Sequence, residues 1–426
     1  MTKNFNSAEL ESVMLDMGAR ARAASALLAK AGPEARTKAL NAMATRIREN
    51  ASSILEANAK DMVAARAKDL TPSLLDRLEL SADRLESIAQ GLENVANVAD
   101  PVGDVLASWE RPNGLKISRV RGPIGVIGII YESRPNVTAD AGSLCVRSAN
   151  ATILRGGSES VHSATAITTA LQQGLEDAGL PKDAVQMVPT TDRDAVGHML
   201  KGLNGNLDVI VPRGGKGLVG RVQEDARVPV IGHLEGICHT YVHENADPQK
   251  AVDIVTNAKM RRTGICGSTE TMLIDASIAN DLLPKIAASL VAAGCELRGN
   301  DKAQAIVDMK AATQEDWSTE YLAPIISIKV VENIDEAIAH VETYSSGHTE
   351  AIITEDTAAA ERFLNDIDAS IVMHNASTQF ADGGEFGMGA EIGIATGRLH
   401  ARGPVGAEQL TIFKYQVRGT GQTRPT

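Results

Sequence analysis

From Gly122 onward the chain alternates short β-branched segments with longer amphipathic segments, and this alternation limits its fold more than any other feature. Runs of valine and isoleucine are followed by stretches with helical spacing, and then by further apolar runs. A strand, a helix and a second strand in succession predict a parallel sheet covered by helices. The first series comprises expected strands over residues 126–130, 152–154, 185–188, 209–211 and 228–231, with helices over 139–148 and 163–178.

A second series of the same kind follows, so the sequence predicts two Rossmann-like units in tandem. Two such units leave a cleft between them, where a cofactor and a substrate usually meet. The glycine-rich stretch 383–397 is a long loop suited to closing that cleft. The second series comprises expected strands over 269–274, 325–330, 351–354 and 370–373, and expected helices over 247–259, 278–293, 334–344 and 357–366.

The segments outside this alternation predict a helical start and a small β extension. Residues 7–100 read as helices, with Ser7 as a plausible N-cap. The Asn113-Gly114 pair favours a hairpin turn between strands over 104–109 and 115–121. Such a ribbon serves either as an oligomer contact or as a plain surface hairpin. We predict an α/β fold in which residues 1–103 and 122–235 form one unit, 236–400 the second, and 104–121 with 405–418 the β extension.

Composition and charge narrow the class of partner. The formal net charge is -12 and aromatic residues make up 3% of the chain, which argues against nucleic acid or an anionic membrane as the main partner. The four cysteines are far apart and form neither a CxxC pair nor a metal-ligand spacing, so a reducing, cytoplasmic setting is expected. The N-terminal residues are polar and do not resemble a signal peptide, and the apolar runs are too short to span a bilayer.

Cys266 is the strongest candidate for chemistry. Arg261 and Arg262 precede it and Gly267 follows it, and nearby positive charge favours a reactive thiolate. A lone cysteine is more often a buried core thiol. We favour a nucleophile because the chain also offers a cofactor motif and Asn136, whose amide ends a strand and is able to donate to an oxyanion, although an asparagine after proline is also common turn chemistry.

Two glycine-rich segments follow expected strands and suit a dinucleotide. Gly215-Lys-Gly-Leu-Val-Gly220 has the spacing of a dinucleotide-binding turn, although the acidic residue expected farther on is imperfect, with Glu235 the nearest in position. A glycine-rich turn without a ligand explains that spacing equally well. Arg155, followed by two glycines, suits an anionic group of a cofactor.

The nine histidines form no cluster in the sequence. His340 and His348 are interpreted as structural residues in a helix and the turn after it. His233, His239 and His243 lie near the junction of the two units, but no acidic or thiol partner stands at a suitable spacing. We therefore predict no metal.

These motifs, placed in order, resemble the aldehyde dehydrogenase superfamily and, within it, the reductases that act on glutamyl phosphate. The resemblance covers nearly the whole chain, and its most specific element is the run 331–352, in which Val341 replaces the more usual isoleucine. The runs 131–136 and 257–274 are also similar to that family. The roles that the resemblance implies are nucleophile for Cys266, oxyanion donor for Asn136, cofactor turn for Gly215 and Gly220, adenine ribose contact for Arg155, and nicotinamide ribose contact for Glu320.

Two departures from the superfamily pattern refine this expectation. Ser158 stands where NAD-preferring relatives carry a glutamate, and losing that carboxylate beside Arg155 favours NADPH over NADH. The glutamate that activates a hydrolytic water is not clearly present, since Glu235 is near its place but in an altered context. A reductase that expels phosphate needs no such water.

The resemblance implies NADPH-dependent reduction of L-glutamyl 5-phosphate to L-glutamate 5-semialdehyde through a cysteine thioester, the second step of proline biosynthesis from glutamate. Residues 1–235 without the hairpin would bind NADP(H), residues 236–400 would be catalytic, and the β extension would join a homo-oligomer. A glutamate 5-kinase is a candidate partner. Alternatives are a hydrolytic NAD(P)-dependent aldehyde dehydrogenase, a Cys-His hydrolase and a non-catalytic scaffold. The candidate substrate contacts are Arg134, Arg261 and Arg262 for the phosphate, and Asn375 and Ser377 for the amino-acid end.

Overall fold

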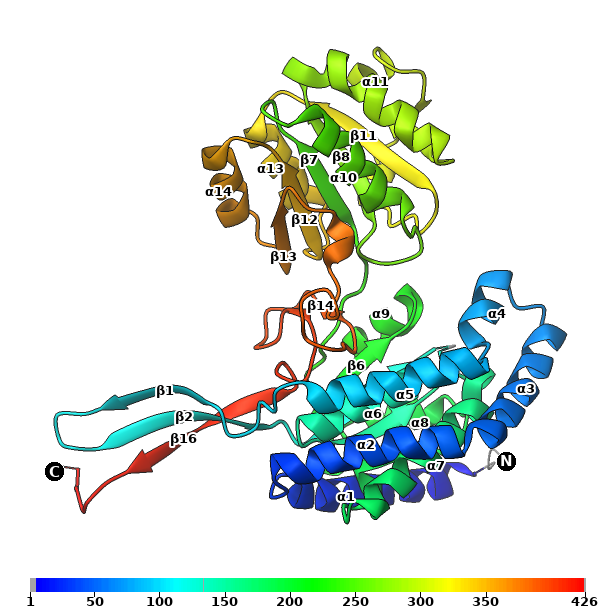
Figure 1. Cartoon of the computed structure of the whole chain (residues 1–426), viewed down its shortest axis with the longest axis vertical. Coiled ribbons are helices and arrows are strands. Elements are labelled where there is room, and N and C mark those ends of the chain that lie inside the picture. Colours follow the sequence, from blue (N-terminus) through cyan, green and yellow to red (C-terminus); the bar gives the residue numbers. More distant parts are fainter. Residues whose placement is uncertain (1–4, 133, 425–426) are drawn as a thin grey trace.

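The computed structural model describes residues 5–132 and 134–424 of the 426-residue chain. Two parallel sheets flanked by helices form two lobes joined by narrow connections, and an antiparallel arm projects from the first lobe (Figure 1). The predicted α/β architecture, two Rossmann-like sheets with a small β extension, is therefore confirmed.

The first lobe is built on a four-stranded parallel sheet in the order β5-β4-β3-β6. Every residue of β3, one of its two inner strands, is buried, which explains the unbroken apolar run in the sequence. The predicted strand over 228–231 is wrong, because Val230 forms only an isolated bridge to Ile210, and Pro229 has no N–H to offer a ladder. The strands are β3 (Val126–Tyr131), β4 (Ala151–Arg155), β5 (Val185–Met187) and β6 (Val209–Arg213).

Helices from two parts of the chain cover this sheet. The N-terminal helices pack with α7, and a Cβ on Gly174 would collide with the backbone of Met43, so α7 and α2 approach closely. Asn6, rather than the predicted Ser7, caps the first helix by accepting from the Glu9 N–H. The helices are α1 (Ser7–Leu28), α2 (Pro33–Glu49), α3 (Ala51–Ala67), α4 (Pro72–Leu78), α5 (Ala82–Asn97), α6 (Val137–Arg147), α7 (Val161–Asp177), α8 (Asp194–Leu200) and α9 (Lys216–Asp225).

The second lobe holds a seven-stranded parallel sheet in the order β10-β9-β11-β8-β7-β12-β13. The sequence analysis missed β7, β9 and β10. The strands are β7 (Cys238–Val242), β8 (Thr269–Asp275), β9 (Glu296–Gly299), β10 (Lys310–Ala311), β11 (Ile325–Val331), β12 (Thr349–Ile353) and β13 (Ile371–His374). The helices are α10 (Pro248–Met260), α11 (Ala276–Ala292), α12 (Asp301–Gln304), α13 (Ile334–Tyr344) and α14 (Thr357–Asp366).

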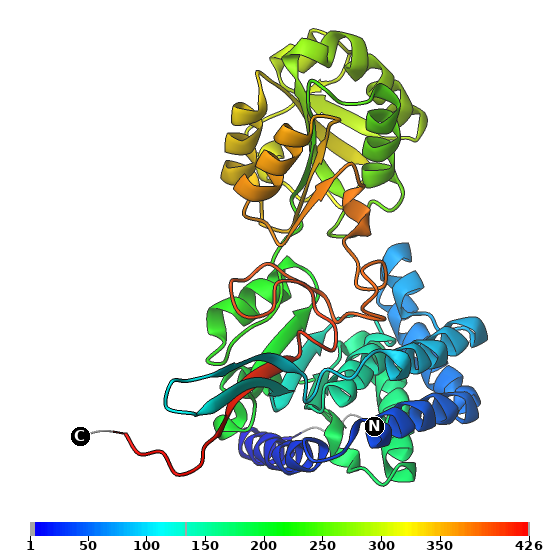
Figure 2. The ribbon, with the colours of Figure 1, turned by 60° about the vertical axis from the view of Figure 1, so that its left-hand side comes forward.

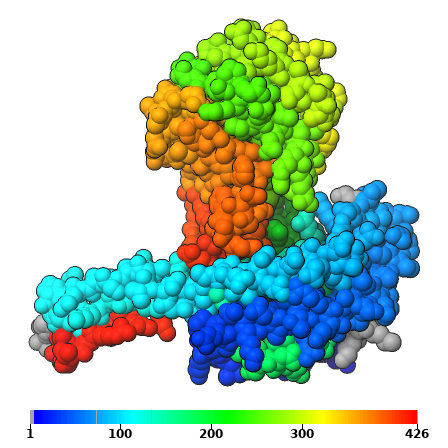
Figure 3. Space-filling view, in the orientation of Figure 1, coloured from blue at the N-terminus to red at the C-terminus, as the bar shows by residue number. Residues whose placement is uncertain are grey.

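The arm is a three-stranded antiparallel ribbon in the order β1-β2-β16. It combines the predicted hairpin, β1 (Val105–Glu110) and β2 (Lys116–Pro123), with the last strand, β16 (Thr411–Arg418). Figure 3 shows the arm standing clear of both lobes. Several large apolar side chains on it are exposed, namely Val105, Trp109, Ile412, Phe413, Tyr415 and Val417.

The two lobes face each other through opposite ends of their sheets. Segments that hold candidate site residues follow the carboxyl ends of β3, β4 and β6 in the first lobe. Other such segments precede the amino ends of β7, β8 and β12 in the second lobe. The glycine-rich stretch runs back from the second lobe to the first, as Figure 2 shows, and includes the short strand β14 (Ile394–Ala395), paired with β15 (Gly403–Pro404). No helix among the described residues is long and apolar enough to cross a membrane.

Candidate active site

Cys266 lies half-buried in the loop between α10 and β8. A Cβ on Gly236 would collide with the Cys266 carbonyl group, so only glycine lets the segment before β7 pass this loop. The Cys238 thiol donates to the same carbonyl oxygen at 3.1 Å, and burial raises the pKa of that thiol well above its usual range. Cys238 therefore stays protonated and holds the loop of Cys266 in place.

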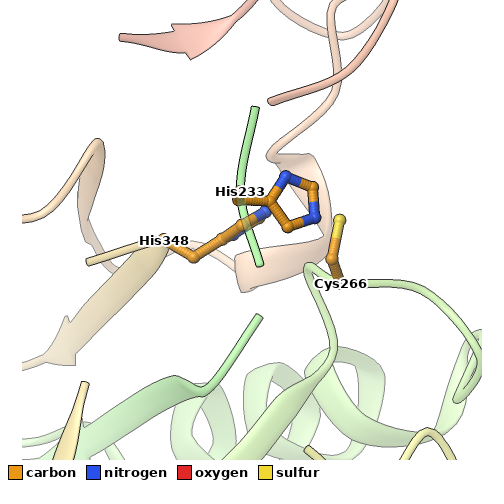
Figure 4. Close-up of side chains that lie close together, drawn as sticks. All are labelled: His233, Cys266 and His348. Carbon is orange, nitrogen blue, oxygen red and sulfur yellow. The ribbon is translucent and has the colours of Figure 1, made fainter. Parts of the chain in front are cut away.

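Two imidazoles stand beside the Cys266 sulfur (Figure 4). One donor atom of each of His233, Cys266 and His348 lies within 4.8 Å of the other two. The His233 Nδ1–H donates to the Ile394 carbonyl oxygen, with 2.6 Å between N and O, because a carbonyl only accepts. Burial lowers the pKa of His233, so its Nε2 carries a lone pair at neutral pH.

Sequence patterns do not reveal this pair of histidines. They predict a structural role for His348 and place no thiol near His233. The thiol comes from a different segment, which only the order of the strands brings close. The one available sequence signal was the junction position of His233, and it was too weak to use.

Arg134 lies near the thiol, and further arginines lie near Arg134. Burial, and then the charges of Arg213, Arg77 and Arg262, lower the pKa of Arg134 to about 10, and Arg134 also interacts electrostatically with Cys266. Arg77 and Arg213 were not foreseen from the sequence. Arg261 differs, since its guanidinium donates to the Gln379 side-chain oxygen at 3.2 Å. Arg134 therefore places positive charge near the thiol.

Two N–H groups are available to an oxyanion. The Asn136 amide donates to the Asp140 carboxylate at 2.9 Å, which orients the amide and leaves its second N–H free for a ligand. Burial raises the pKa of Asp140 to about 6. The Cys266 backbone N–H has no acceptor among the residues that the structure describes. An oxyanion formed on an acyl group attached to Cys266 is thus offered a main-chain and a side-chain donor.

A cavity of about 380 Å³ opens at the carboxyl ends of β3, β4 and β6. Arg155 is half-buried at its wall and donates to the Gly156 and Thr191 carbonyl oxygens, at 2.9 Å each. Its Nε is buried without a partner among the described residues, which suits an acceptor supplied by a ligand. The remaining lining includes the predicted Ser158 and the unforeseen Glu132, Glu159, Arg193 and Arg221.

The glycine motif has the strand-turn-helix context that its spacing requires. Gly215 is the N-cap residue of α9, and Gly220 lies inside the helix. The Gly215 N–H donates to the Glu132 carboxylate at 3.0 Å, so an anion already sits at this helix start.

Glu320 and Glu235 lie where the two lobes join. The Glu320 carboxylate accepts from the Gly236 N–H at 3.0 Å, and burial raises the pKa of Glu320. Glu235 forms an ion pair with Lys216 at the start of α9. The carboxylate of Glu235 is therefore paired with a lysine in this structure.

The two residues suggested for the amino-acid end of a substrate hold their own turn. Asn375 has φ 51°, and its amide is bonded to both backbone groups of Thr354 at 3.0 and 2.9 Å. Ser377 is buried, and its hydroxyl accepts from the Gln379 N–H at 3.3 Å. Their contact with a substrate stays a prediction, and these bonds count against it.

The model of the aldehyde dehydrogenase family matches residues 6–315 and 303–391. The chain belongs to this family. Within the family it belongs with the gamma-glutamyl phosphate reductases. It is 64% identical over 420 residues to the gamma-glutamyl phosphate reductase of Hyphomonas neptunium, with 98% of each chain covered. It is 62% identical over 418 residues to that of Rhodospirillum rubrum, again with 98% of each covered.

The fold gives the same result. The crystal structure of gamma-glutamyl phosphate reductase from Thermotoga maritima superimposes with a TM-score of 0.95 at 45% identity, covering 97% of this chain and 100% of that one. Membership of the aldehyde dehydrogenase family implies a nicotinamide cofactor, and the arginines and the helix start beside the cavity suit the anionic groups of one.

Proposed function

We propose that this protein reduces L-glutamyl 5-phosphate to L-glutamate 5-semialdehyde and releases phosphate, with NADPH as the reductant. The relatives named gamma-glutamyl phosphate reductase support the substrate. The observation that carries the proposal is the Cys266 thiol, which lies among arginines and unpaired N–H donors while the one candidate for a water-activating carboxylate, Glu235, is held by Lys216.

The residues of the chain have the following parts in the reaction. The Cys266 sulfur attacks the acyl carbon, and His233, with Nε2 unprotonated, takes the thiol proton. Asn136 and the Cys266 N–H hold the oxyanion, and the carbon–oxygen bond to phosphate breaks to leave a thioester. Bound NADPH supplies hydride to the thioester carbonyl carbon. The carbon–sulfur bond then breaks, the aldehyde leaves, and the sulfur regains its proton.

The preference for NADPH rests on the charges around the cavity. Arg155, Arg193 and Arg221 line it, and Ser158 stands in place of a carboxylate. These groups favour the 2′-phosphate of NADPH. Glu132 and Glu159 line the same cavity and oppose that preference, but the three guanidiniums outnumber these two carboxylates.

The Cys266→Ser variant tests the covalent mechanism. Phosphate-dependent reduction of NADP by glutamate semialdehyde should fall by several orders of magnitude, because a hydroxyl is a far weaker nucleophile than a thiolate. The matched control is Cys295→Ser, which changes a buried cysteine just after α11 and should retain activity. Near-normal turnover in Cys266→Ser would remove the thioester from the mechanism. Mass spectrometry of the protein with acyl phosphate but no NADPH should show an acyl adduct on Cys266.

The alternative reactions make different demands. A hydrolytic aldehyde dehydrogenase would work without phosphate and would lose activity in Glu235→Gln. The ion pair between Glu235 and Lys216 argues against this hydrolytic reaction. A Cys-His hydrolase needs an imidazole beside the thiol, and His233 meets that demand. It needs no nicotinamide, however, and the family of this chain uses one. Turnover that requires both phosphate and NADP separates the reductase from both alternatives.

The exposed apolar arm supports the predicted homo-oligomer. The rings of Trp109 and Tyr415 pack edge to face on this arm, with 6.1 Å between their centroids, and both side chains are exposed. Apolar side chains grouped on a projecting ribbon mark a protein contact. Phe413→Ser with Tyr415→Ser should lower the mass measured by light scattering, whereas Leu27→Ser, equally exposed on α1, should not. Docking of a glutamate 5-kinase remains a prediction that co-sedimentation would test.

A further inference from the structure

We infer that His233, Cys266 and His348 form a binding site for a borderline-soft divalent metal such as Zn²⁺, and that occupancy reversibly blocks the thiol. The inhibitory consequence rests on the proposed function of Cys266. The binding site itself stands on geometry alone.

The donor set is suited to zinc. Two imidazoles and a thiolate are common zinc ligands, and three protein ligands leave a fourth position for water. Their donor atoms lie within 4.8 Å of one another, whereas tetrahedral zinc bonds of about 2.0–2.3 Å place donors roughly 3.3–3.6 Å apart. The three side chains must therefore close by up to about 1.2–1.5 Å. Cys266 lies on a loop and is half-buried, which allows that movement.

Each imidazole has one ring nitrogen hydrogen-bonded within the protein and the other without a partner among the described residues. His233 donates Nδ1–H to the Ile394 carbonyl oxygen, so Nε2 keeps the lone pair. His348 is fully buried, with Nδ1 2.9 Å from the Thr349 hydroxyl oxygen and Nε2 without a partner among the described residues. An outer hydrogen bond on one ring nitrogen, with the other nitrogen free, is the usual arrangement of a metal-binding histidine. A buried nitrogen left without a partner costs free energy, which a metal would recover.

The surrounding charge sets the strength and the consequence of binding. Arg134 and its neighbouring guanidiniums repel a divalent cation, so the site should be weaker than a structural zinc site. Binding replaces the thiol proton, which passes to solvent, with one metal-sulfur bond. The sulfur lone pair needed for attack on an acyl carbon is then occupied. Chelation of the metal restores the free thiol.

Cobalt titration of the purified full chain tests the site without relying on turnover. Co²⁺ should bind at one ion per chain and produce a thiolate-to-cobalt charge-transfer band, which disappears in Cys266→Ser. His233→Asn and His348→Asn retain an N–H donor at the Nδ1 position and lack Nε2. Each should weaken cobalt binding at least tenfold. His400→Gln, an exposed histidine, is the matched control and should bind as wild type does.

The activity measurement adds the consequence. Zn²⁺ should inhibit the reductase, with chelator reversing the loss, and the order of affinities among variants should follow the cobalt titration. A cobalt spectrum without a thiolate band, or one unchanged in Cys266→Ser, would overturn the site even if zinc inhibits. A thiolate band in a protein that lacks reductase activity would leave the site standing and refute only the proposed function.

Discussion

The charge of Arg155 should decide which dinucleotide this protein prefers. The 2′-phosphate of NADPH carries roughly −1.5 to −2 charges, and NADH lacks it. Arg155 is half-buried at the cavity wall, already held by the Gly156 and Thr191 carbonyl groups. A hydrogen bond to a charged group contributes about 1.5–3 kcal/mol, which is roughly a 10- to 150-fold change in affinity. In Arg155→Ala, the ratio of NADH to NADPH dissociation constants should therefore fall by that factor.

The ratio is the right quantity because the substitution also has a structural cost. Arg155→Ala leaves two carbonyl oxygens without their donor, and that loss affects both dinucleotides alike. Arg193→Ala and Arg221→Ala should shift the ratio less, since both side chains are exposed and their charges are screened by solvent. Arg418→Ala, exposed on the arm, is the control and should leave the ratio unchanged.

Fluorescence titration with NADPH and NADH gives both constants for each variant. Salt should weaken NADPH binding more than NADH binding in the wild type, and this difference should shrink in Arg155→Ala. Equal weakening of both dinucleotides in Arg155→Ala would refute the reasoning. So would a wild-type protein that binds NADH more tightly than NADPH, in which case Glu159 outweighs the arginines.

Three further predictions concern the site and its support. Asn136→Ala should lower kcat by about 100- to 1,000-fold in steady-state assays, because one oxyanion donor is lost; a loss confined to KM would contradict that role. The pKa of Asp140 is raised from 3.8 to about 6 in the folded state, so its proton stabilises the fold at low pH and that contribution disappears as pH rises through 6. Relative to wild type, the urea midpoint of Asp140→Asn should therefore rise between pH 4 and pH 7. A difference between the two midpoints that does not change with pH would count against the raised pKa of Asp140. Lys259 and Glu270 form a fully buried ion pair, so Lys259→Met should cost about 3–5 kcal/mol of unfolding free energy, and adding Glu270→Leu should restore most of it; additive losses would contradict the pairing.

Local sequence patterns predicted much of the architecture. The alternation of apolar runs and helical stretches predicted both parallel sheets, and the bounds 334–344 and 357–366 of two helices agree with the structure. Local rules also failed in understandable ways. The predicted strand over 228–231 does not form, because Pro229 cannot donate to a ladder, and β7 was missed because His239 and Thr240 interrupt its apolar pattern.

The sequence by itself determined the two sheets, the helix that follows the glycine motif, and the position of Cys266 in the loop before a buried strand. The spacing of apolar residues indicates which face of a helix or strand is buried, and turn residues indicate where the element ends. Both signals are local properties of the backbone. What stands beside the thiol was decided by the tertiary structure alone. Strand β7 pairs between β8 and β12, so three segments far apart in the chain begin at one edge of the sheet. His233, Cys266 and His348 come together there, and no local pattern encodes that order of strands.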